Sequence, residues 1–323
     1  MNRNDGPLLS LLEIRKHFPV RKSFFSTETL TVHAVDGVSL AVPAGKTVGL
    51  VGESGCGKTT LGRVAIRLIP PDAGRILFEG RDITTLAGEE LRRLRRGMQI
   101  IFQDPYSSLN PRMRVREIVG EGWLVHGIAR GREIRERAEQ LLVRVGLSAD
   151  AAEKYPHEFS GGQRQRIGIA RAIALSPRLI VADEPVSALD VSVQAQILNL
   201  LGDIQEEYGI AYLFVSHDLR VIRHVSDTVA VMYLGVLMEV SPAADLFREP
   251  LHPYSRSLLS AVPLPGQKPR ETIVLKQEIP SPIHIPAGCR FHTRCFMAQK
   301  VCEKIVPPLR EVSPGRLAAC HFV

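Results

Sequence analysis

The sequence lacks a long hydrophobic run, and this absence limits the classes of protein to which the chain can belong. No apolar stretch reaches the roughly 18 residues that a membrane-spanning helix requires. The longest candidate, residues 228–240, is too short and predicts a buried strand with flanks. The N-terminus has neither a continuous apolar segment nor a small-residue cleavage site, so no secretory signal is expected. We therefore expect the chain to stay in the cytosol, where cysteines are reduced thiols or metal ligands rather than disulfides.

Internal repeats, low-complexity tracts and runs of three or more heptads are also missing. The 323 residues are 45% hydrophobic and 23% charged, which is typical of a globular protein with a sizeable core. The net charge of +7, from 41 basic and 34 acidic residues, favours anionic partners such as nucleotides, nucleic acid or an anionic membrane surface. The one dense basic run, residues 91–96, is interpreted as a solvated helix face.

Strands alternate with helical segments along most of the chain. Loose alternation predicts two hairpin strands at 10–18 and 30–42, and a continuous apolar strand follows at 45–52. Residues 104–178 are mostly helical in pattern. Later strands separated by helices indicate a parallel sheet covered on both faces. After about residue 250 the chain becomes rich in proline, and a small C-terminal module is expected there.

A glycine-rich turn, "GESGCGKT" at Gly52–Thr59, follows the apolar strand and precedes a helical pattern. Glycines let several backbone N–H groups point into one hollow, and the helix adds its positive N-terminus. Lys58 can then reach the β- and γ-phosphates of a nucleoside triphosphate, and the Thr59 hydroxyl can bind Mg²⁺. The thiol of Cys56 is expected to be chemically silent. The residues expected to line this site are Gly52, Glu53, Ser54, Gly55, Cys56, Gly57, Lys58, Thr59 and Thr60.

An acidic pair ends another buried strand, "LIVADEP". Asp183 is the natural carboxylate on the metal side. Glu184, one residue further, can face the attacking water as general base or water-orienting group. A structural alternative is a strand-end acidic pair that caps a helix.

The stretch "FSGGQRQR" at 159–166 is the most discriminating. A Ser-Gly-Gly turn before a helix makes a second anion-binding N-terminus, which one chain does not need for one nucleotide. Together with both phosphate-site motifs, this element resembles the ATP-binding subunit of ABC transporters. The resemblance covers roughly residues 10–323. It implies that Ser160, Gly161, Gly162 and Gln163 contact the nucleotide held by the opposite subunit, so that two subunits sandwich two ATP molecules head to tail.

The same resemblance implies roles for further residues. Gln103 of "IFQDP" matches the glutamine that touches Mg²⁺ and water and links the site to the membrane subunits. Asp190 of "SALD" lies in the loop that crosses the dimer seam. His217 of "VSHD" matches the histidine that holds the γ-phosphate and positions water with Glu184. Phe18 matches the aromatic that stacks on adenine, with Phe25 as a rival. The expected Mg²⁺ ligands are Thr59, Gln103 and Asp183, and the expected catalytic residues are Glu184, His217, Lys58 and Gln103.

The resemblance implies an α/β fold: a P-loop ABC-type nucleotide-binding domain with a RecA-like parallel-sheet core, an antiparallel β subdomain and an α-helical subdomain. It places this domain at residues 1–260, with the helical subdomain at about 104–178. Residues 261–323 form the C-terminal peptide-importer extension.

Several stretches, among them "HPYSRSLLSAVP" and "GCRFHTRC", are similar to the dipeptide/oligopeptide importer branch. The implied function is an ATPase that energises peptide import from the cytoplasmic face of the plasma (inner) membrane. The implied partners are a second, related ATPase subunit, two transmembrane permease subunits and, indirectly, an extracytoplasmic solute-binding protein, with no nucleic acid. One alternative is an importer for nickel or another small solute. An alternative of another class is a soluble ABC ATPase acting on the ribosome or DNA.

Four of the five cysteines fall after residue 288, with the spacing C-x5-C-x6-C-x17-C. Cys289, Cys295, Cys302 and Cys320 could together hold a [4Fe–4S] cluster or Zn²⁺. The spacing matches neither common zinc ribbons nor the ferredoxin run. The stretch "CRFHTRC" resembles the iron–sulfur motif of peptide-importer ATPases, which favours [4Fe–4S]. Zinc and unligated thiols remain alternatives.

Overall fold

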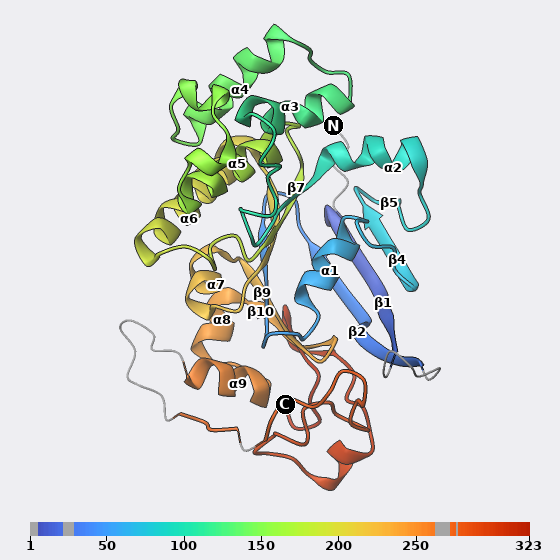
Figure 1. Cartoon of the computed structure of the whole chain (residues 1–323). Coiled ribbons are helices and arrows are strands. Elements are labelled where there is room, and N and C mark those ends of the chain that lie inside the picture. Colours follow the sequence, from blue (N-terminus) through green and yellow to red (C-terminus); the bar gives the residue numbers. More distant parts are fainter. Residues whose placement is uncertain (1–5, 22–28, 262–271, 276) are drawn as a thin grey trace. The chain divides into compact units, whose positions relative to one another are not determined.

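The computed structural model describes residues 6–21, 29–261, 272–275 and 277–323 (Figure 1). The chain divides into two compact units, which are described separately. Unit 1 comprises Met1–Val42, Thr47–Thr84 and Phe214–Val323, and unit 2 comprises Pro43–Lys46 and Thr85–Leu213. Phe25, the rival for adenine stacking, lies outside the described residues. Among the described residues, no helix combines the length and the apolar composition needed to cross a membrane.

The first sheet of unit 1 is antiparallel, with strand order β2-β1-β4-β5. Two of its strands, β1 and β2, are the expected hairpin strands, and both extend further than predicted toward the insert that joins them. Leu9 and Leu11 of β1 are buried in alternation, and a register shift between Leu11 and Ile14 brings Ile14 to the interior as well. The bounds are β1 (Leu9–Arg21), β2 (Thr29–Val42), β4 (Ala73–Phe78) and β5 (Arg81–Asp82).

A second set of strands in unit 1 includes β3, which leads into the glycine-rich turn. β3 pairs in parallel with β9, and β9 pairs with β10 in an antiparallel hairpin. Leu234 and Gly235 both have positive φ (42° and 83°), as a two-residue hairpin turn requires. β12 continues the sheet from β10, and β11 pairs with β12. The bounds are β3 (Thr47–Val51), β9 (Thr228–Tyr233), β10 (Val236–Pro242), β11 (Arg310–Ser313) and β12 (Arg316–Ala318).

The helices of unit 1 are short. Within the described part of this unit, α1 and α9 are the longest with eight residues each, so packing rather than intrinsic propensity must stabilise them. α9 is amphipathic, with Tyr254 and Leu259 in the core. The bounds are α1 (Lys58–Ala65), α7 (Leu219–Val225), α8 (Ala243–Arg248), α9 (Pro253–Ser260) and the short 3₁₀ helix η4 (Lys300–Glu303).

Unit 2 joins two parallel strands, β6 and β7, to a largely helical region. The sole tryptophan, Trp123, is buried there, and its Nε1 donates a hydrogen bond to the Ala174 carbonyl oxygen at 2.6 Å. The expected solvated face at 91–96 is confirmed, because Arg92 and Arg93 are exposed and pair with Glu89. The bounds are α2 (Gly88–Leu94), η1 (Arg95–Gly97), β6 (Met98–Ile101), α3 (Val115–Val125), α4 (Arg132–Arg144), η2 (Ala149–Glu153), η3 (Pro156–Glu158), α5 (Gly161–Ile173), β7 (Leu179–Asp183), α6 (Val191–Tyr208) and β8 (Ala211–Val215), whose last two residues belong to unit 1.

Candidate functional site

The glycine-rich turn connects β3 to α1, as the sequence predicts. Gly57 is the residue before the helix and has φ 109°, a conformation that side chains with a Cβ rarely adopt. A Cβ at this position would lie 2.0 Å from the Ala34 carbonyl oxygen. The turn therefore requires glycine here both for its backbone shape and for its close approach to β2.

Lys58 directs its side chain back into the turn. Its Nζ donates hydrogen bonds to the carbonyl oxygens of Gly52 at 2.8 Å and Glu53 at 3.0 Å, and the residue is only 5% exposed. A buried ammonium beside the positive N-terminus of α1 makes this hollow strongly attractive to an anion. Burial raises the pKa of the nearby Cys56 thiol, so that thiol is protonated at neutral pH.

Two other predicted site residues belong to unit 1. Phe18 lies in β1 opposite Val32 of β2, is half-buried, and has Lys16 Nζ 5.5 Å from its ring centre. His217 is exposed and lies between β8 and α7. Its neighbour Asp218 accepts a hydrogen bond from the Arg220 backbone N–H at 2.8 Å and so caps α7. His217 is thus exposed in the connection between two elements, whereas Phe18 lies within β1 and is only partly accessible.

The acidic pair and the glutamine come together in unit 2. Because β6 and β7 run parallel, their carboxyl ends meet at one sheet edge. Asp183 ends β7 and is 2% exposed. Glu184 has φ 48°, a strained conformation for this residue, and its Oε2 accepts a hydrogen bond from Gln103 Nε2 at 2.9 Å. The Glu184 carboxylate is therefore partly buried and held in a fixed orientation directly after β7.

The Ser-Gly-Gly turn forms the start of α5. The Ser160 hydroxyl accepts from the Gln163 backbone N–H at 3.4 Å, and Gln163 Oε1 accepts from the Ser160 N–H at 3.0 Å. A Cβ on Gly162 would lie 2.5 Å from Val193 Cγ1, so this glycine lets the turn approach α6 closely. Asp190 occupies the position before α6 and is exposed. An exposed helix N-terminus with a serine hydroxyl at its tip can bind an anion.

The predicted ATP-site residues thus fall into two groups. The phosphate loop, Phe18 and His217 belong to unit 1, whereas Gln103, Asp183, Glu184, the Ser160 turn and Asp190 belong to unit 2. Their roles remain predictions from the sequence.

The four C-terminal cysteines line a single pocket within unit 1. Cys289 and Cys302 are buried and are joined by a backbone hydrogen bond of 2.8 Å from the Cys289 N–H to the Cys302 carbonyl oxygen. Burial raises the pKa of Cys289 to about 11 and also raises that of Cys295. The pocket by itself therefore keeps these two thiols protonated at neutral pH, and a bound metal would have to displace the protons.

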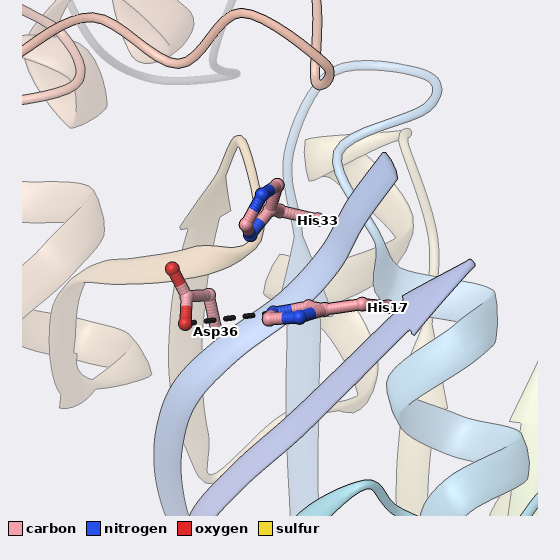
Figure 2. Close-up of side chains that lie close together, drawn as sticks. All are labelled: His17, His33 and Asp36. Carbon is pink, nitrogen blue, oxygen red and sulfur yellow. Dashed lines mark ion pairs between the residues drawn. The ribbon is translucent and has the colours of Figure 1, made fainter. Parts of the chain in front are cut away.

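A group that the sequence did not suggest lies on the β1–β2 hairpin (Figure 2). Among the described residues, His17, His33 and Asp36 have their ligand atoms within 4.8 Å of one another. His17 Nε2 lies 3.7 Å from Asp36 Oδ1. Asp36 also pairs with Arg290, and Arg15 Nε lies 3.7 Å from it. A divalent cation here would face two guanidinium groups, so this cluster is better explained as a charge network around Asp36.

Two family descriptions match the chain. The family described as "ABC transporter" matches residues 35–187, and "Oligopeptide/dipeptide transporter, C-terminal region" matches residues 238–302. The first match contains the phosphate loop, the Ser160 turn and the acidic pair, and the second contains three of the four C-terminal cysteines.

Proteins named as peptide transport ATP-binding proteins match over nearly the whole chain. The oligopeptide transport ATP-binding protein AppF of Bacillus subtilis is 52% identical over 323 residues, covering 99% of this chain and 98% of AppF. A putative peptide import ATP-binding protein of Brucella ovis is 52% identical over 317 residues, covering 98% of each.

Solved structures are similar as well. The dimeric ATP-binding cassette MJ0796, in a post-hydrolysis state bound to ADP and Pi, is 28% identical with a TM-score of 0.65. The match covers 73% of this chain and 98% of that cassette. CbiO1 of Clostridium perfringens, part of the ABC transporter complex cbiONQ, is 27% identical with a TM-score of 0.63, covering 76% of this chain and 92% of CbiO1.

Proposed function

Because this chain belongs to the ABC transporter family, in its oligopeptide/dipeptide branch, we propose that it hydrolyses ATP to drive the import of peptides across a membrane. The fold class predicted from the sequence, a P-loop ABC-type nucleotide-binding domain, is confirmed by the likeness to solved cassettes. The observation that carries the proposal is the completeness of the site. One chain holds both a buried lysine in a phosphate loop and a capped Ser-Gly-Gly turn, which the cassette of a second subunit would use.

We propose the following division of labour for hydrolysis. The phosphate loop and Lys58 bind the β- and γ-phosphates, and Phe18 stacks on the adenine. Thr59, Asp183 and Gln103 would hold Mg²⁺, which when bound neutralises charge that develops on the phosphate oxygens. Each residue acts mainly by positioning and by charge, since phosphoryl transfer needs little covalent help from the protein.

Glu184 receives the proton of the attacking water or orients that water, and His217 holds the γ-phosphate from the other side. Gln103 fixes the Glu184 carboxylate through the 2.9 Å hydrogen bond, so a shift of the glutamine would move the base. The Ser160–Gly162 turn completes the site of the opposite subunit rather than its own. The second subunit is proposed to be a related chain.

A groove in the helical region supports the proposal of membrane partners. It encloses about 810 Å³ within unit 2, lined by residues of α3, α4 and their flanks. Leu124 and Val125 in its wall are 56% and 47% exposed, although both are apolar. Such a groove suits an amphipathic helix from a permease subunit, and we propose that it receives one at the cytoplasmic face.

Transport in proteoliposomes tests the proposed function. Vesicles that contain the chain together with its permease subunits and its second ATPase should take up a labelled tripeptide only when Mg·ATP is supplied. Chelating Mg²⁺ should abolish both uptake and hydrolysis, because the phosphate charge is then not neutralised. Uptake of Ni²⁺ in place of peptide would replace the peptide assignment with the metal-ion alternative. ATP hydrolysis that is stimulated by ribosomes or DNA, with no uptake, would contradict an importer altogether.

We further propose that residues 261–323 form an appended module whose four cysteines hold a [4Fe–4S] cluster. The donor set fits, since four thiols line one pocket walled by apolar groups such as Phe291 and Pro307. The Met297 N–H donates to Cys295 Sγ at 3.4 Å, a contact of the kind that tunes cluster sulfurs.

Iron content tests the cluster. Protein purified without oxygen should be brown and contain about four irons per chain if all four thiolates bind one cubane. Cys289→Ser and Cys302→Ser should each lose most of the iron, because they remove buried ligands. Cys56→Ser should retain it, since this fifth cysteine lies in the phosphate loop. Colourless protein with stoichiometric zinc would contradict the cluster, as would iron loss in Cys56→Ser alone.

A further inference from the structure

An arginine of the four-cysteine segment, residues 289–320, forms an ion pair with Glu53 of the phosphate loop. Arg294 lies between Cys289 and Cys295, and its guanidinium forms a two-pronged ion pair with Glu53. Nη1 lies 2.7 Å from Oε2, and Nη2 lies 3.0 Å from Oε1. The Arg294 side chain is only 7% exposed and that of Glu53 24%, so solvent screens this pair weakly.

The surroundings of Arg294 fix its orientation. Its Nε donates to the Gln277 carbonyl oxygen at 3.0 Å, and Nη1 also lies 3.4 Å from the Tyr233 hydroxyl. With all three guanidinium nitrogens in contact with the protein, the planar fork has one preferred placement. The Glu53 carboxylate in turn binds both terminal nitrogens of this guanidinium, which is charged at all physiological pH values.

Glu53 is held at its backbone as well. Its N–H donates a hydrogen bond to the Tyr254 hydroxyl at 3.0 Å. The Tyr254 ring packs against Tyr233 and against Phe291 of the four-cysteine segment, with ring centres 4.8 and 5.2 Å apart. The first residue after Gly52 is thus fixed through both its amide and its carboxylate by groups outside the loop.

A second arginine of the segment acts on the neighbouring strand. Arg290 pairs with Asp36 of β2 and donates to the Leu234 carbonyl oxygen. The Asp36 N–H also donates to the Gly235 carbonyl oxygen at 2.9 Å. Residues 290–294 thus form two ion pairs around the phosphate loop. One is with Glu53 of the loop itself, and the other is with Asp36, two residues beyond Ala34, whose carbonyl oxygen Gly57 approaches closely.

The charge of Glu53 gives the pair a consequence for nucleotide binding. An unpaired carboxylate at the edge of a hollow for a triphosphate would repel the ligand. We propose that Arg294 is a positioning residue of the ATP site, which neutralises Glu53 and holds the phosphate loop in its binding shape. The four-cysteine segment is thereby a working part of the nucleotide site, although it lies outside the phosphate-binding motifs.

Nucleotide affinity of the purified full-length chain tests this proposal, with a fluorescent ATP analogue and Mg²⁺ as the probe. Arg294→Gln should weaken binding by about tenfold, because it leaves Glu53 charged and unpaired. Arg294→Lys keeps the charge but not the fork, so the loss should be about threefold. In the Glu53→Gln background, the further change Arg294→Gln should cost less than about twofold, because the two residues act through each other. Arg248→Gln removes an exposed ion pair with Asp245 of the same unit and should leave affinity unchanged.

Comparing the loss of nucleotide affinity in the wild-type and Glu53→Gln backgrounds distinguishes a positioning role of Arg294 from general stabilisation of the fold. Melting temperatures without nucleotide are measured for all variants, and Arg294→Lys serves if Arg294→Gln does not fold. The proposal is wrong if Arg294→Gln binds like wild type, or if its loss is equally large in the Glu53→Gln background. The inference rests on the proposed function only in taking the loop as a triphosphate site. Wild-type chain that fails to bind Mg·ATP would refute that function, whereas an unaffected Arg294→Gln would refute this inference alone.

Discussion

Replacing Glu184 with glutamine should slow ATP hydrolysis by about 100-fold or more while leaving nucleotide binding close to that of wild type. The amide has the shape of the carboxylate but cannot accept the proton of the attacking water. Glu184 is suited to this role because its φ of 48° turns the side chain at the end of β7, and because Gln103 holds one carboxylate oxygen at 2.9 Å. The buried Asp183 lies directly before it, as the last residue of β7.

Steady-state phosphate release and binding of a fluorescent nucleotide, measured on the same preparation, check this prediction. Asp203→Asn is the matched control, because Asp203 is an exposed carboxylate on α6 of the same unit. The control should hydrolyse ATP at the wild-type rate. Near-normal turnover of Glu184→Gln would remove Glu184 from its role, and a parallel loss of nucleotide binding would indicate that the residue serves the fold instead.

Replacing Ser160 with arginine should reduce hydrolysis by the assembled complex by at least about tenfold, although the phosphate loop itself is untouched. The serine hydroxyl caps α5, and the turn packs closely on α6 through Gly162. A long side chain at this exposed tip would block the approach of a nucleotide held by another subunit. Loss of one preorganised donor to a transferring phosphoryl group is itself worth a comparable factor.

The sequence predicted the strands and helices best next to the functional motifs. The apolar strand before the glycine-rich turn becomes β3, and the strand that ends in Asp183 becomes β7, because a short apolar run of this kind is typical of a strand buried on both faces of a sheet. The mostly helical pattern predicted for residues 104–178 includes α4, whose buried residues Ala138 and Leu142 are spaced by about one turn. Motif spacing was informative because a phosphate loop needs glycine at fixed positions, as Gly57 demonstrates.

Long-range pairing could not be predicted in the same way. Nothing in the local pattern indicates that Arg294 meets Glu53, 241 residues away, or that Arg290 meets Asp36. The C-terminal segment was expected as a small module of its own, yet β12 joins the sheet of unit 1 beside β10. Charged side chains in a proline-rich segment carry no periodic signal, so their partners appear only once the chain is folded. The same limit applies to the His17–His33 pair, which cross-strand register brings together.

The central claim is that a triphosphate is bound between the phosphate loop of one subunit and the Ser-Gly-Gly turn of another. Comparing wild type and Ser160→Arg in two states tests it most directly: nucleotide affinity of the isolated chain, and ATP turnover of the assembled complex. The account predicts wild-type affinity in the isolated variant together with turnover lowered at least about tenfold in the complex. Unchanged turnover in the complex would contradict the shared site, and so would an equal loss of affinity in the isolated chain.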